Sequence, residues 1–308
     1  MLDAVRTTQR STLIAAELRD ALGRRQKELP SRWLVGPVDA SYVGADASGV
    51  TESVEVDLCR TLLESDLAHV PPRGVVCVRA SAAPATALVV NSVQARGALS
   101  AVAVVESNVT TARTVARHFG ERVSANGIAV GEFAADWTLA LPPLDAFPRP
   151  RLYLCLGNAL GAVTAVGAVR MLRVFRSTMN PADTLLLGLA TSAALAGVDP
   201  TSHFDALERI DDTFGSSFMG GRFDCESRYD AEQRRSETHL VARRAFEAQI
   251  PGVCDVRFRK GESIRTAVSC TFDRARTSAM LAGVGFTLQA WEADPTGTFA
   301  VASAVPAT

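Results

Sequence analysis

The chain has 308 residues, of which 47% are hydrophobic, with a formal net charge of −1 and a pI near 6.4. This length allows one large domain or two moderate ones, and the apolar content excludes wholesale disorder. The balanced charge excludes the global basic field that holds nucleic acid, so we expect no nucleic-acid partner.

The six cysteines show neither Cys-x-x-Cys spacing nor close pairing with histidine, so we expect reduced thiols, a cytoplasmic protein and no metal site. The first ten residues lack the apolar stretch of a signal peptide. Residues 152–169 are free of charge and about long enough to span a bilayer, but their glycines and the arginines that follow favour a soluble core. We therefore expect no membrane partner.

The amino-terminal part predicts two helices separated by a loop region. Residues 8–29 carry leucines at helical spacing with arginines between them, and this pattern ends at Pro30. Residues 31–53 are mixed and contain glycine, which indicates a loop region with short elements. Residues 55–67 again have helical spacing and stop before a pair of prolines.

From about residue 70 to residue 190, short apolar runs alternate with helical segments, which predicts a mostly parallel α/β sheet. The expected strands are 74–78, 99–105, 128–130, 152–156 and 184–187. The expected helices are 83–93, 109–119 and 166–175.

One crossover unit within this sheet predicts a site. Gly157 and Gly161 lie just past strand 152–156, where a chain must turn tightly or let a ligand approach its backbone. Strand, glycine turn, helix and strand together form a right-handed crossover. Ligands of such sheets sit beyond the carboxyl ends of strands, so we predict a site at Gly157 and Asn158.

The pattern changes after residue 190. Residues 218–230 show no clear period. An antiparallel pair is expected at the end of the chain, because a good turn sequence, Asp-Pro-Thr-Gly, separates two apolar runs. The expected elements are a helix at 202–214, strands at 236–245, 254–258 and 266–272, a helix at 275–283, and paired strands at 286–291 and 299–304.

Six motifs occur in the order in which a known family has them. Gly-Glu-Phe at 131–133 resembles that family's Gly-Asp-Phe, and Leu-Cys-Leu-Gly-Asn-Ala-Leu-Gly at 154–161 resembles its Phe-Leu-Gly-Ser-Thr-Ile-Gly. The others are Leu-Pro-Ser-Arg-Trp at 29–33, Pro-Ala-Asp-Thr-Leu-Leu-Leu-Gly at 181–188, Glu-Thr-His-Leu-Val at 237–241 and Gly-Glu-Ser-Ile-Arg-Thr-Ala-Val-Ser at 261–269. The chain thereby resembles a divergent member of the histidine-specific, S-adenosylmethionine (SAM)-dependent methyltransferases. The best-known member trimethylates the α-amino group of histidine on the route to ergothioneine.

The resemblance implies a Rossmann-like methyltransferase α/β sheet with a second, smaller α+β substrate domain. We expect the methyltransferase-like domain at 60–190 plus 287–308, and the substrate domain at 1–59 plus 191–286. The resemblance also implies SAM as cofactor, a small-molecule substrate and a transferase activity in biosynthesis.

The first strand departs from the family. The family has Glu-Leu-Gly-Ser-Gly-Thr there, whose glycines let the backbone reach the methionyl part of SAM, whereas this chain has Cys-Val-Arg-Ala-Ser-Ala at 77–82. Arg79 stands where the first glycine would be, and a β-carbon at a close approach or at positive φ costs about 1 kcal/mol or more. The cofactor is therefore expected to be held unusually or to be lost.

The expected cofactor-binding residues are Arg79, Ser81, Glu106, Glu132, Phe133, Gly157 and Asn158. Glu106 ends a strand where nucleotide-binding sheets place an acid on a ribose hydroxyl; the alternative is a capping or surface glutamate. Glu132 and Phe133 match a family pair that contacts adenine, and the alternative is a loop acid with a core phenylalanine. Arg79 either holds an anion or pairs with a neighbouring acid.

The expected substrate-binding residues are Ala162, Thr238, Ala267 and Ser269. By the resemblance, Ala162 replaces the asparagine that holds the substrate, and Ala267 replaces the acid that pairs with its imidazole. In the same motif, at residues 266–269, Ser269 is retained. A site that has lost these hydrogen-bonding groups loses the specificity that depended on them, so we do not expect histidine as substrate.

The motif at 237–241 gives a second group of candidates. Glu237 and His239 alternate with Thr238, so they are expected on one face of a strand and Thr238 on the other. A lone histidine is usually structural or exposed, and either face is a candidate for lining a pocket. No catalytic residue is assigned.

Two functional hypotheses stay open. The first is a methyltransferase acting on an amino acid or a related small amine, in which positioning does most of the catalytic work. The second is a homologue that has lost methyl transfer and serves as a partner subunit, or binds or transforms another small molecule. A protein partner or a homo-oligomer is compatible with both hypotheses.

Overall fold

The structure, a computed structural model, describes residues 2–30, 33–34, 50–65, 71–82, 85–123, 126–192, 200–218 and 221–307. The chain divides into two compact units. The larger unit consists of Pro37–Ala194 and Ser269–Thr308, and the smaller unit consists of Met1–Gly36 and Leu195–Val268. Most of the loop region expected at 31–53 lies outside the described residues.

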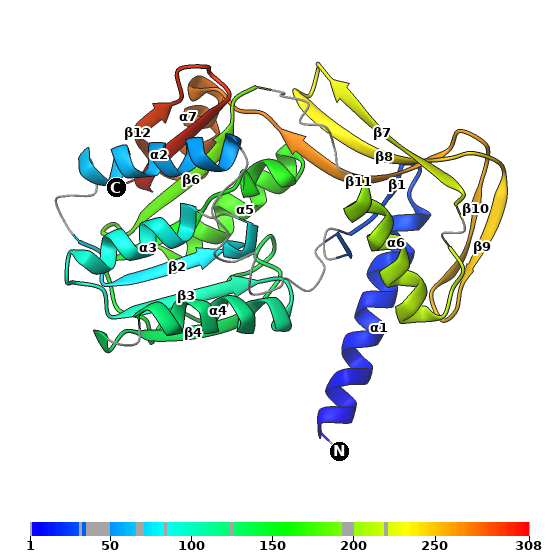
Figure 1. The fold of residues 1–308 in the computed structure, drawn as a ribbon, viewed down its shortest axis with the longest axis horizontal. Helices are drawn as coiled ribbons and strands as arrows, with labels where there is room; N and C mark the ends of the chain where they lie inside the picture. The colour runs from blue at the N-terminus through cyan, green and yellow to red at the C-terminus, as the bar shows by residue number, and fades with distance from the viewer. Residues whose placement is uncertain are drawn as a thin grey trace. The chain divides into compact units, whose positions relative to one another are not determined.

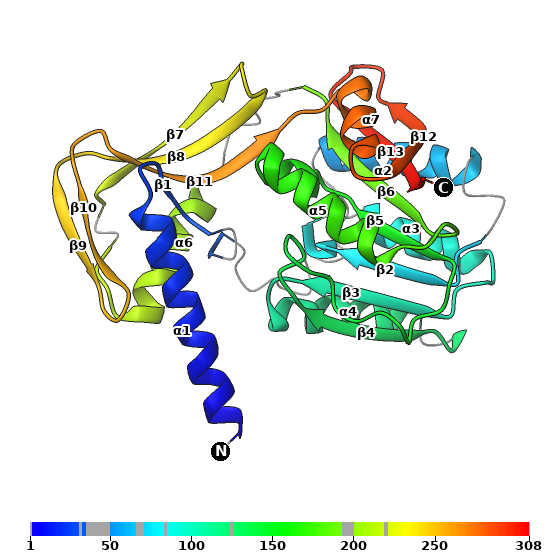
Figure 2. The ribbon, with the colours of Figure 1, turned by 180° about the vertical axis from the view of Figure 1, so that it is seen from behind.

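The described part of the larger unit contains a seven-stranded sheet of order β12-β13-β6-β5-β2-β3-β4 (Figures 1 and 2). Its parallel strands are β2 (Gly74–Val78), β3 (Ala101–Glu106), β4 (Ala129–Ala134), β5 (Arg151–Cys155) and β6 (Thr184–Ala190). β13 (Phe299–Pro306) pairs antiparallel with β6 and with β12 (Phe286–Ala293). The prediction of a mostly parallel, Rossmann-like α/β sheet is confirmed, and so is the antiparallel pair at the end.

Helices cover both faces of this sheet. One face carries α2 (Val50–Ser65), α3 (Ala85–Ala95) and α4 (Val109–Val123) (Figure 1). The opposite face carries α5 (Ala165–Thr178) and α7 (Arg274–Ala282) (Figure 2). Strands β2, β3 and β5 are buried along their whole length, which explains why they form continuous apolar runs in the sequence.

The strand order creates a topological switch point between β2 and β5. From β2 the chain continues to β3 and β4 on one side, and it then returns to β5 and β6 on the other side. Open α/β sheets bind ligands at the carboxyl ends of the strands at such a point. Arg79 follows β2 directly and Gly157 lies just beyond β5, so two of the predicted site residues stand at this edge.

In the smaller unit, α1 (Leu2–Gly23) and α6 (Thr201–Phe214) share one hydrophobic core with its strands. Leu18, Leu207, Leu240 and Ile264 are fully buried in this core. The described strands form a sheet of order β1-β11-β8-β7 and a separate β9-β10 hairpin. Their bounds are β1 (Lys27–Glu28), β7 (Phe223–Asp230), β8 (Arg235–Ala242), β9 (Phe246–Ile250), β10 (Cys254–Phe258) and β11 (Ser263–Cys270).

Two local predictions in the smaller unit are wrong. The first helix ends at Gly23 rather than at residue 29, because glycine is a weak helix former and Lys27–Glu28 instead pairs parallel with β11. Residues 223–230, expected to lack a period, form the edge strand β7. Most of its side chains are at least partly exposed, so no alternation of polar and apolar residues marks it in the sequence.

The boundaries of the two units differ from the expected domain ranges. α7 lies within the range expected for the substrate domain and α2 straddles its edge, yet both helices belong to the larger unit. The reason is packing, because Leu62 of α2 and Leu281 of α7 are fully buried in the cores that flank the large sheet. The division of function between the units stays a prediction.

Of the described helices, none is long and apolar enough to cross a bilayer.

Candidate functional site

Arg79 connects the ends of β2 and β5. Its φ is 56°, a left-handed conformation that glycine adopts at no steric cost. Its amide donates to the carbonyl oxygen of Val105 at 3.0 Å, and its guanidinium donates to the carbonyl oxygen of Gly157 at 3.4 Å. The backbone thus keeps a conformation typical of a glycine turn, while the side chain reaches across the switch point.

Glu55 of α2 contacts the same glycine. Glu55 is only 2% exposed, and its Oε1 accepts a hydrogen bond from the Gly157 amide at 2.8 Å. A β-carbon at Gly188, in β6, would lie 1.8 Å from this oxygen, so the position of the carboxylate requires glycine there. Gly157 is therefore held by a carboxylate at its N–H and by a guanidinium at its C=O.

Glu106 and Ser81 come together at the end of β3. Both residues are buried, and Glu106 Oε1 accepts a hydrogen bond from the Ser81 amide at 2.8 Å. Burial raises the pKa of Glu106 above its usual value, and hydrogen bonds from Ser81 and the charge of Arg79 offset part of that rise. The acid thus stands where nucleotide-binding sheets hold a ribose hydroxyl.

Glu132 and Phe133 do not come together, because successive residues of a strand point to opposite faces. Glu132 is exposed and pairs with Arg113 of α4 at 3.3 Å. Phe133 packs edge-on against Phe147, with 5.8 Å between ring centroids, on the opposite face. The structure therefore separates the two members of the predicted pair.

Asn158 and Ser269, predicted to bind cofactor and substrate respectively, are in contact. Asn158 has a φ of 51°, and its Oδ1 accepts from the Ala190 amide at 3.1 Å. Its Nδ2 donates to the Ser269 hydroxyl at 3.3 Å. A β-carbon at Gly161 would lie 2.4 Å from Asn158 Oδ1, so this glycine makes room for the asparagine side chain.

The other predicted substrate residues offer few polar groups. Ala162 ends the 3-10 helix η4 (Ala159–Ala162) in the larger unit. Ala267 lies on β11 in the smaller unit, next to Thr266, whose hydroxyl donates to the carbonyl oxygen of Thr238 at 3.1 Å. Since an alanine side chain neither donates nor accepts hydrogen bonds, both alanines contribute only shape. The predicted substrate residues are divided between the two units.

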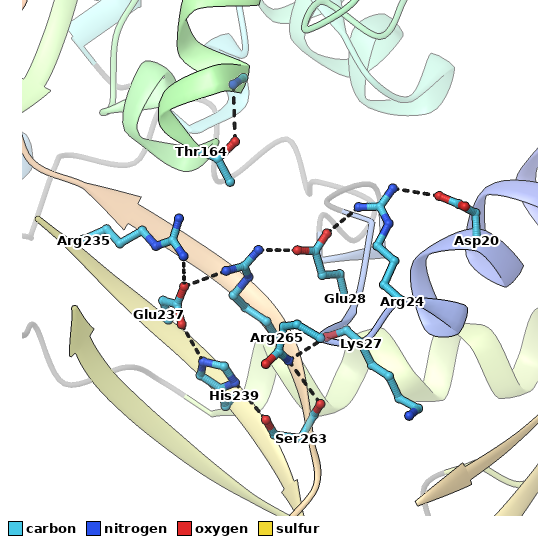
Figure 3. Close-up of polar contacts among 12 residues, drawn as sticks. Asp20, Arg24, Lys27, Glu28, Thr164, Arg235, Glu237, His239, Ser263 and Arg265 are labelled. Atoms are coloured by element: carbon cyan, nitrogen blue, oxygen red, sulfur yellow. Dashed lines mark hydrogen bonds and ion pairs between the residues drawn. The ribbon is translucent and has the colours of Figure 1, made fainter. Parts of the chain in front are cut away.

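A network of charges lies on β8 and β11 of the smaller unit (Figure 3). Glu237 Oε1 pairs with Arg235 at 2.5 Å and with Arg265 at 2.6 Å, while Oε2 contacts His239 Nε2 at 2.9 Å. His239 Nδ1 contacts the Ser263 hydroxyl at 3.0 Å. The prediction that Glu237 and His239 share one face of the strand is confirmed.

The network favours a neutral imidazole beside a carboxylate. Burial lowers the pKa of His239, the charges of Arg228 and Arg265 lower it further, and the contact with Glu237 opposes this shift. Burial alone would raise the pKa of Glu237, but its hydrogen bonds to His239 and Arg265 and the nearby positive charges outweigh burial and lower it. The arrangement is a fixed set of ion pairs with a single neutral ring.

Glu55 is absent from the residues predicted above, although the sequence carries a signal for it. It precedes Cys59 and Leu62 by four and seven residues, so the three side chains share one face of α2. Both Cys59 and Leu62 are fully buried. An acid on the buried face of a helix needs a polar partner, and this requirement marks Glu55 as a candidate.

A family profile decides the relationship. The profile of the family described as "Histidine-specific methyltransferase, SAM-dependent" matches residues 110–306, well over half of the chain. The chain belongs to this family. The match begins beyond Arg79, Ser81 and Glu106, so the altered β2 turn lies outside it.

Among the described residues of this family member, no three His, Cys, Asp or Glu side chains are grouped to hold a metal ion.

Curated relatives agree with the family assignment. The histidine N-alpha-methyltransferase of Mycolicibacterium smegmatis is 27% identical over 204 residues, which cover 62% of this chain and 63% of that protein. That of Mycobacterium tuberculosis is 27% identical over 191 residues, which cover 58% and 59% of the two chains. The chain thus spans about three fifths of the length of these relatives. A solved methyltransferase from Streptomyces caelestis has 14% identity and a TM-score of 0.49, covering 88% of this chain and 100% of that one.

Proposed function

We propose that this protein binds SAM in its larger unit and methylates a neutral amine of an amino acid or related small molecule other than histidine. Membership of a SAM-dependent family supports the reaction type. The observation that carries the proposal is Glu106, a buried carboxylate at the end of β3 that the Ser81 amide fixes at 2.8 Å. Sheets of this kind use an acid in that position to bind the ribose of a nucleotide cofactor.

Residues near the carboxyl ends of the parallel strands fit the chemistry of SAM. Glu106 would hold the ribose, and Phe133 offers an aromatic ring to the adenine. The methionyl end carries an ammonium and a carboxylate, and Glu55 and Arg79 present the complementary charges. When bound, SAM supplies an electrophilic methyl group. The chain's own residues bind and orient the reactants and exclude water.

Ala162 and Ala267 support a substrate other than histidine. Their methyl groups form no hydrogen bonds with an imidazole or an amine, and the Ser269 hydroxyl already accepts from Asn158. A histidine substrate would therefore lose the partners that the family's asparagine and acid provide, and each buried polar group left without a partner costs about 1 to 3 kcal/mol. An amine attacks only in its neutral form, so the rate is expected to rise with pH until the amine is deprotonated.

We propose a separate role for each unit. The larger unit holds the predicted cofactor-binding residues, together with Ala162 and Ser269. Thr238 and Ala267 belong to the smaller unit. This division corresponds to the expected methyltransferase-like and substrate domains.

Two measurements test the proposed function. Calorimetric titration with SAM and with S-adenosylhomocysteine is expected to give micromolar dissociation constants, and millimolar or absent binding would contradict the cofactor part. An assay with a set of amino acids and small amines tests the substrate part. Methylation is monitored in it by the release of S-adenosylhomocysteine. Histidine is expected to be a poor substrate, and a clear preference for histidine would overturn that part.

Loss of methyl transfer is the second candidate, favoured by the contacts at Gly157. Glu55 and Arg79 occupy the N–H and C=O of this glycine, at the edge where a ligand would approach the backbone. The protein would then act as a partner subunit, or bind or transform another small molecule. Absent binding of both nucleosides, together with co-purification of an intact homologue as a stable complex, would support a partner role.

A further inference from the structure

Strand β7 leaves a long edge of the smaller unit's sheet unpaired. The sheet has the order β1-β11-β8-β7, and β7 lies on the outer side of β8 (Figures 1 and 2). In the part of the chain that the structure describes, no strand pairs with the other side of β7. The strand at the opposite edge, β1, has only two residues, whereas β7 has eight. An edge of that length presents a row of N–H and C=O groups that can pair with another strand.

The hydrogen bonds of β8 show which residues of β7 face outward. The Arg243 amide donates to the carbonyl oxygen of Arg222 at 2.8 Å, beside β7, and the Ala242 amide donates to that of Glu262 at 2.8 Å, beside β11. The β7-β8 register is continuous, so residues of β7 alternate between bonding to β8 and pointing away from it. The outward-pointing residues are Phe223, Cys225, Ser227 and Tyr229.

The charges of β7 are ordered so that the strand complements itself. On one face, every second side chain is charged, in the order Asp224, Glu226, Arg228 and Asp230. In an antiparallel pairing of two copies centred on Glu226, Asp224 would lie opposite the partner's Arg228, and symmetry repeats this attractive contact. At the centre Glu226 would meet its own copy, but each Glu226 already pairs with Arg228 of its own strand at 2.9 Å.

Neighbouring registers place more like charges together. Outward-pointing residues must meet outward-pointing residues, so the centre of the pairing moves in steps of one residue. A pairing centred on Ser227 would set Asp224 opposite the partner's Asp230 twice. A pairing centred on Cys225 would set Asp224 opposite the partner's Glu226 twice. Since like charges directly opposite one another destabilise a sheet, the charges favour the register centred on Glu226.

The same register gives Tyr229 an aromatic partner. The Tyr229 side chain is 48% exposed, on the face that carries Phe223. Phe223 is buried in an aromatic cluster, with its ring centroid 5.4 Å from those of Phe246 and Phe258. The register centred on Glu226 sets Tyr229 opposite the partner's Phe223, so each tyrosine would extend the partner's cluster.

We infer that β7 is a dimerisation edge, on which a second copy of this chain pairs antiparallel through its own β7, centred on Glu226. The interface is isologous, and it joins the two four-stranded sheets into one continuous sheet. The outward backbone groups supply the hydrogen bonds, while the charges and Tyr229 set the register. One strand edge buries little surface, so we expect a reversible dimer with a micromolar dissociation constant.

Sedimentation equilibrium of the full chain tests the interface. Between nanomolar and millimolar concentrations, the wild type is expected to change from monomer to dimer. S227P removes an outward N–H that β8 does not use, so it is expected to abolish dimerisation while keeping the far-UV circular dichroism of the wild type. A wild type that stays monomeric throughout, or a folded S227P variant that dimerises as tightly as the wild type, would overturn the inference.

Charge exchange tests the contacts without altering the backbone. D224R and R228D each turn both attractive contacts into repulsive ones, so each is expected to weaken dimerisation about tenfold. The double variant D224R/R228D restores opposite charges and is expected to recover most of the affinity. The control E247R/R257E exchanges an exposed pair on β9 and β10 and should leave dimerisation unchanged. A double variant no tighter than the single ones would contradict the register.

A single cysteine tests the register directly. In the pairing centred on Glu226, the α-carbons of the two copies of residue 226 lie about 4.5 Å apart, within the range of a disulfide. In a C225S background, E226C is therefore expected to form a disulfide-linked dimer with oxidised glutathione. R228C, whose two copies lie about 14 Å apart, and C225S alone are expected not to. Absence of the E226C cross-link, or an equal cross-link in R228C, would overturn the register.

Discussion

At the scale of single residues, Arg79 keeps the backbone conformation of a glycine turn but adds a charged side chain that glycine lacks. A φ of 56° costs a non-glycine residue about 1 kcal/mol, which a glycine would avoid. Arg234, in the turn between β7 and β8, has a similar φ of 52° and is not itself a predicted site residue. Strain alone therefore does not identify a site, and the contact of the Arg79 guanidinium with Gly157 carries the argument.

Replacing Arg79 by alanine and by glycine measures this strain. R79A removes the guanidinium but keeps the β-carbon, whereas R79G removes both. R79G is therefore expected to exceed R79A in free energy of unfolding by about 0.5 to 1 kcal/mol, as measured by urea denaturation. R234A and R234G are the matched control and should differ by a similar amount. Equal stabilities of R79A and R79G would show that the turn is unstrained.

At the scale of elements, the Glu55 carboxylate fixes how α2 meets the ends of β5 and β6. It accepts from the Gly157 amide beyond β5, and it fills the space beside the α-carbon of Gly188 in β6. Both glycines accommodate this side chain. The N–H of Gly157 donates to the carboxylate, and Gly188 has no β-carbon that would collide with it.

Substituting Gly188 tests this arrangement. A β-carbon there would lie 1.8 Å from Glu55 Oε1, so G188A is expected to destabilise the protein by about 1 to 3 kcal/mol in urea denaturation. In an E55A background the same change should cost much less, which gives a coupling energy between the two positions. G120A in α4, where a β-carbon meets nothing within 4 Å, should instead stabilise by about 0.5 to 1 kcal/mol. Additive effects of E55A and G188A would refute the contact.

Elements that are periodic or continuously apolar could be predicted from the sequence, and so could the residues at strand ends. A parallel sheet buries whole strands, and its topology brings Arg79 and Gly157 to one edge whatever their chemistry. Glu55 escaped prediction because periodicity shows that it lies on a buried face, but not which strand end that face covers. The separation of Glu132 from Phe133 was predictable, since adjacent residues of a strand point to opposite faces of the sheet.

At the scale of the whole molecule, the two units are expected to respond differently to acid. In the smaller unit, burial lowers the pKa of His239, so the stability that its neutral form contributes is complete above the usual value of 6.5 and is lost as the pH falls below it. Burial would raise the pKa of Glu237, but hydrogen bonds to His239 and Arg265 lower it. Its contribution is therefore present above 4.5 and is lost at lower pH.

In the larger unit, burial and the charge of Arg122 also lower the pKa of His118, while the shifted carboxyl groups act at lower pH or in the opposite sense. The Asp294 carboxylate accepts from the amides of Thr296, Thr298 and Phe299 in the turn between β12 and β13. Burial would raise the pKa of Asp294, but the hydrogen bond from the Thr296 hydroxyl and these amide bonds lower it to about 2, so its contribution is complete above 3.8 and is lost only toward pH 2. Burial raises the pKa of Glu106, so its protonation on acidification favours the folded state. The smaller unit should therefore lose structure first.

Tryptophan fluorescence can follow each unit separately, because Trp33 belongs to the smaller unit, and Trp137 and Trp291 belong to the larger. In acid titrations, the Trp33 signal of W137F/W291F is expected to change at higher pH than the signal of W33F. Adding H239Q should move the Trp33 transition to lower pH, because the ring that must take up a proton is gone, whereas adding H118Q, in the larger unit, should not. Coincident transitions of the two reporters, or an H239Q variant that titrates like its parent, would mean that the charge network does not set the acid stability of the smaller unit.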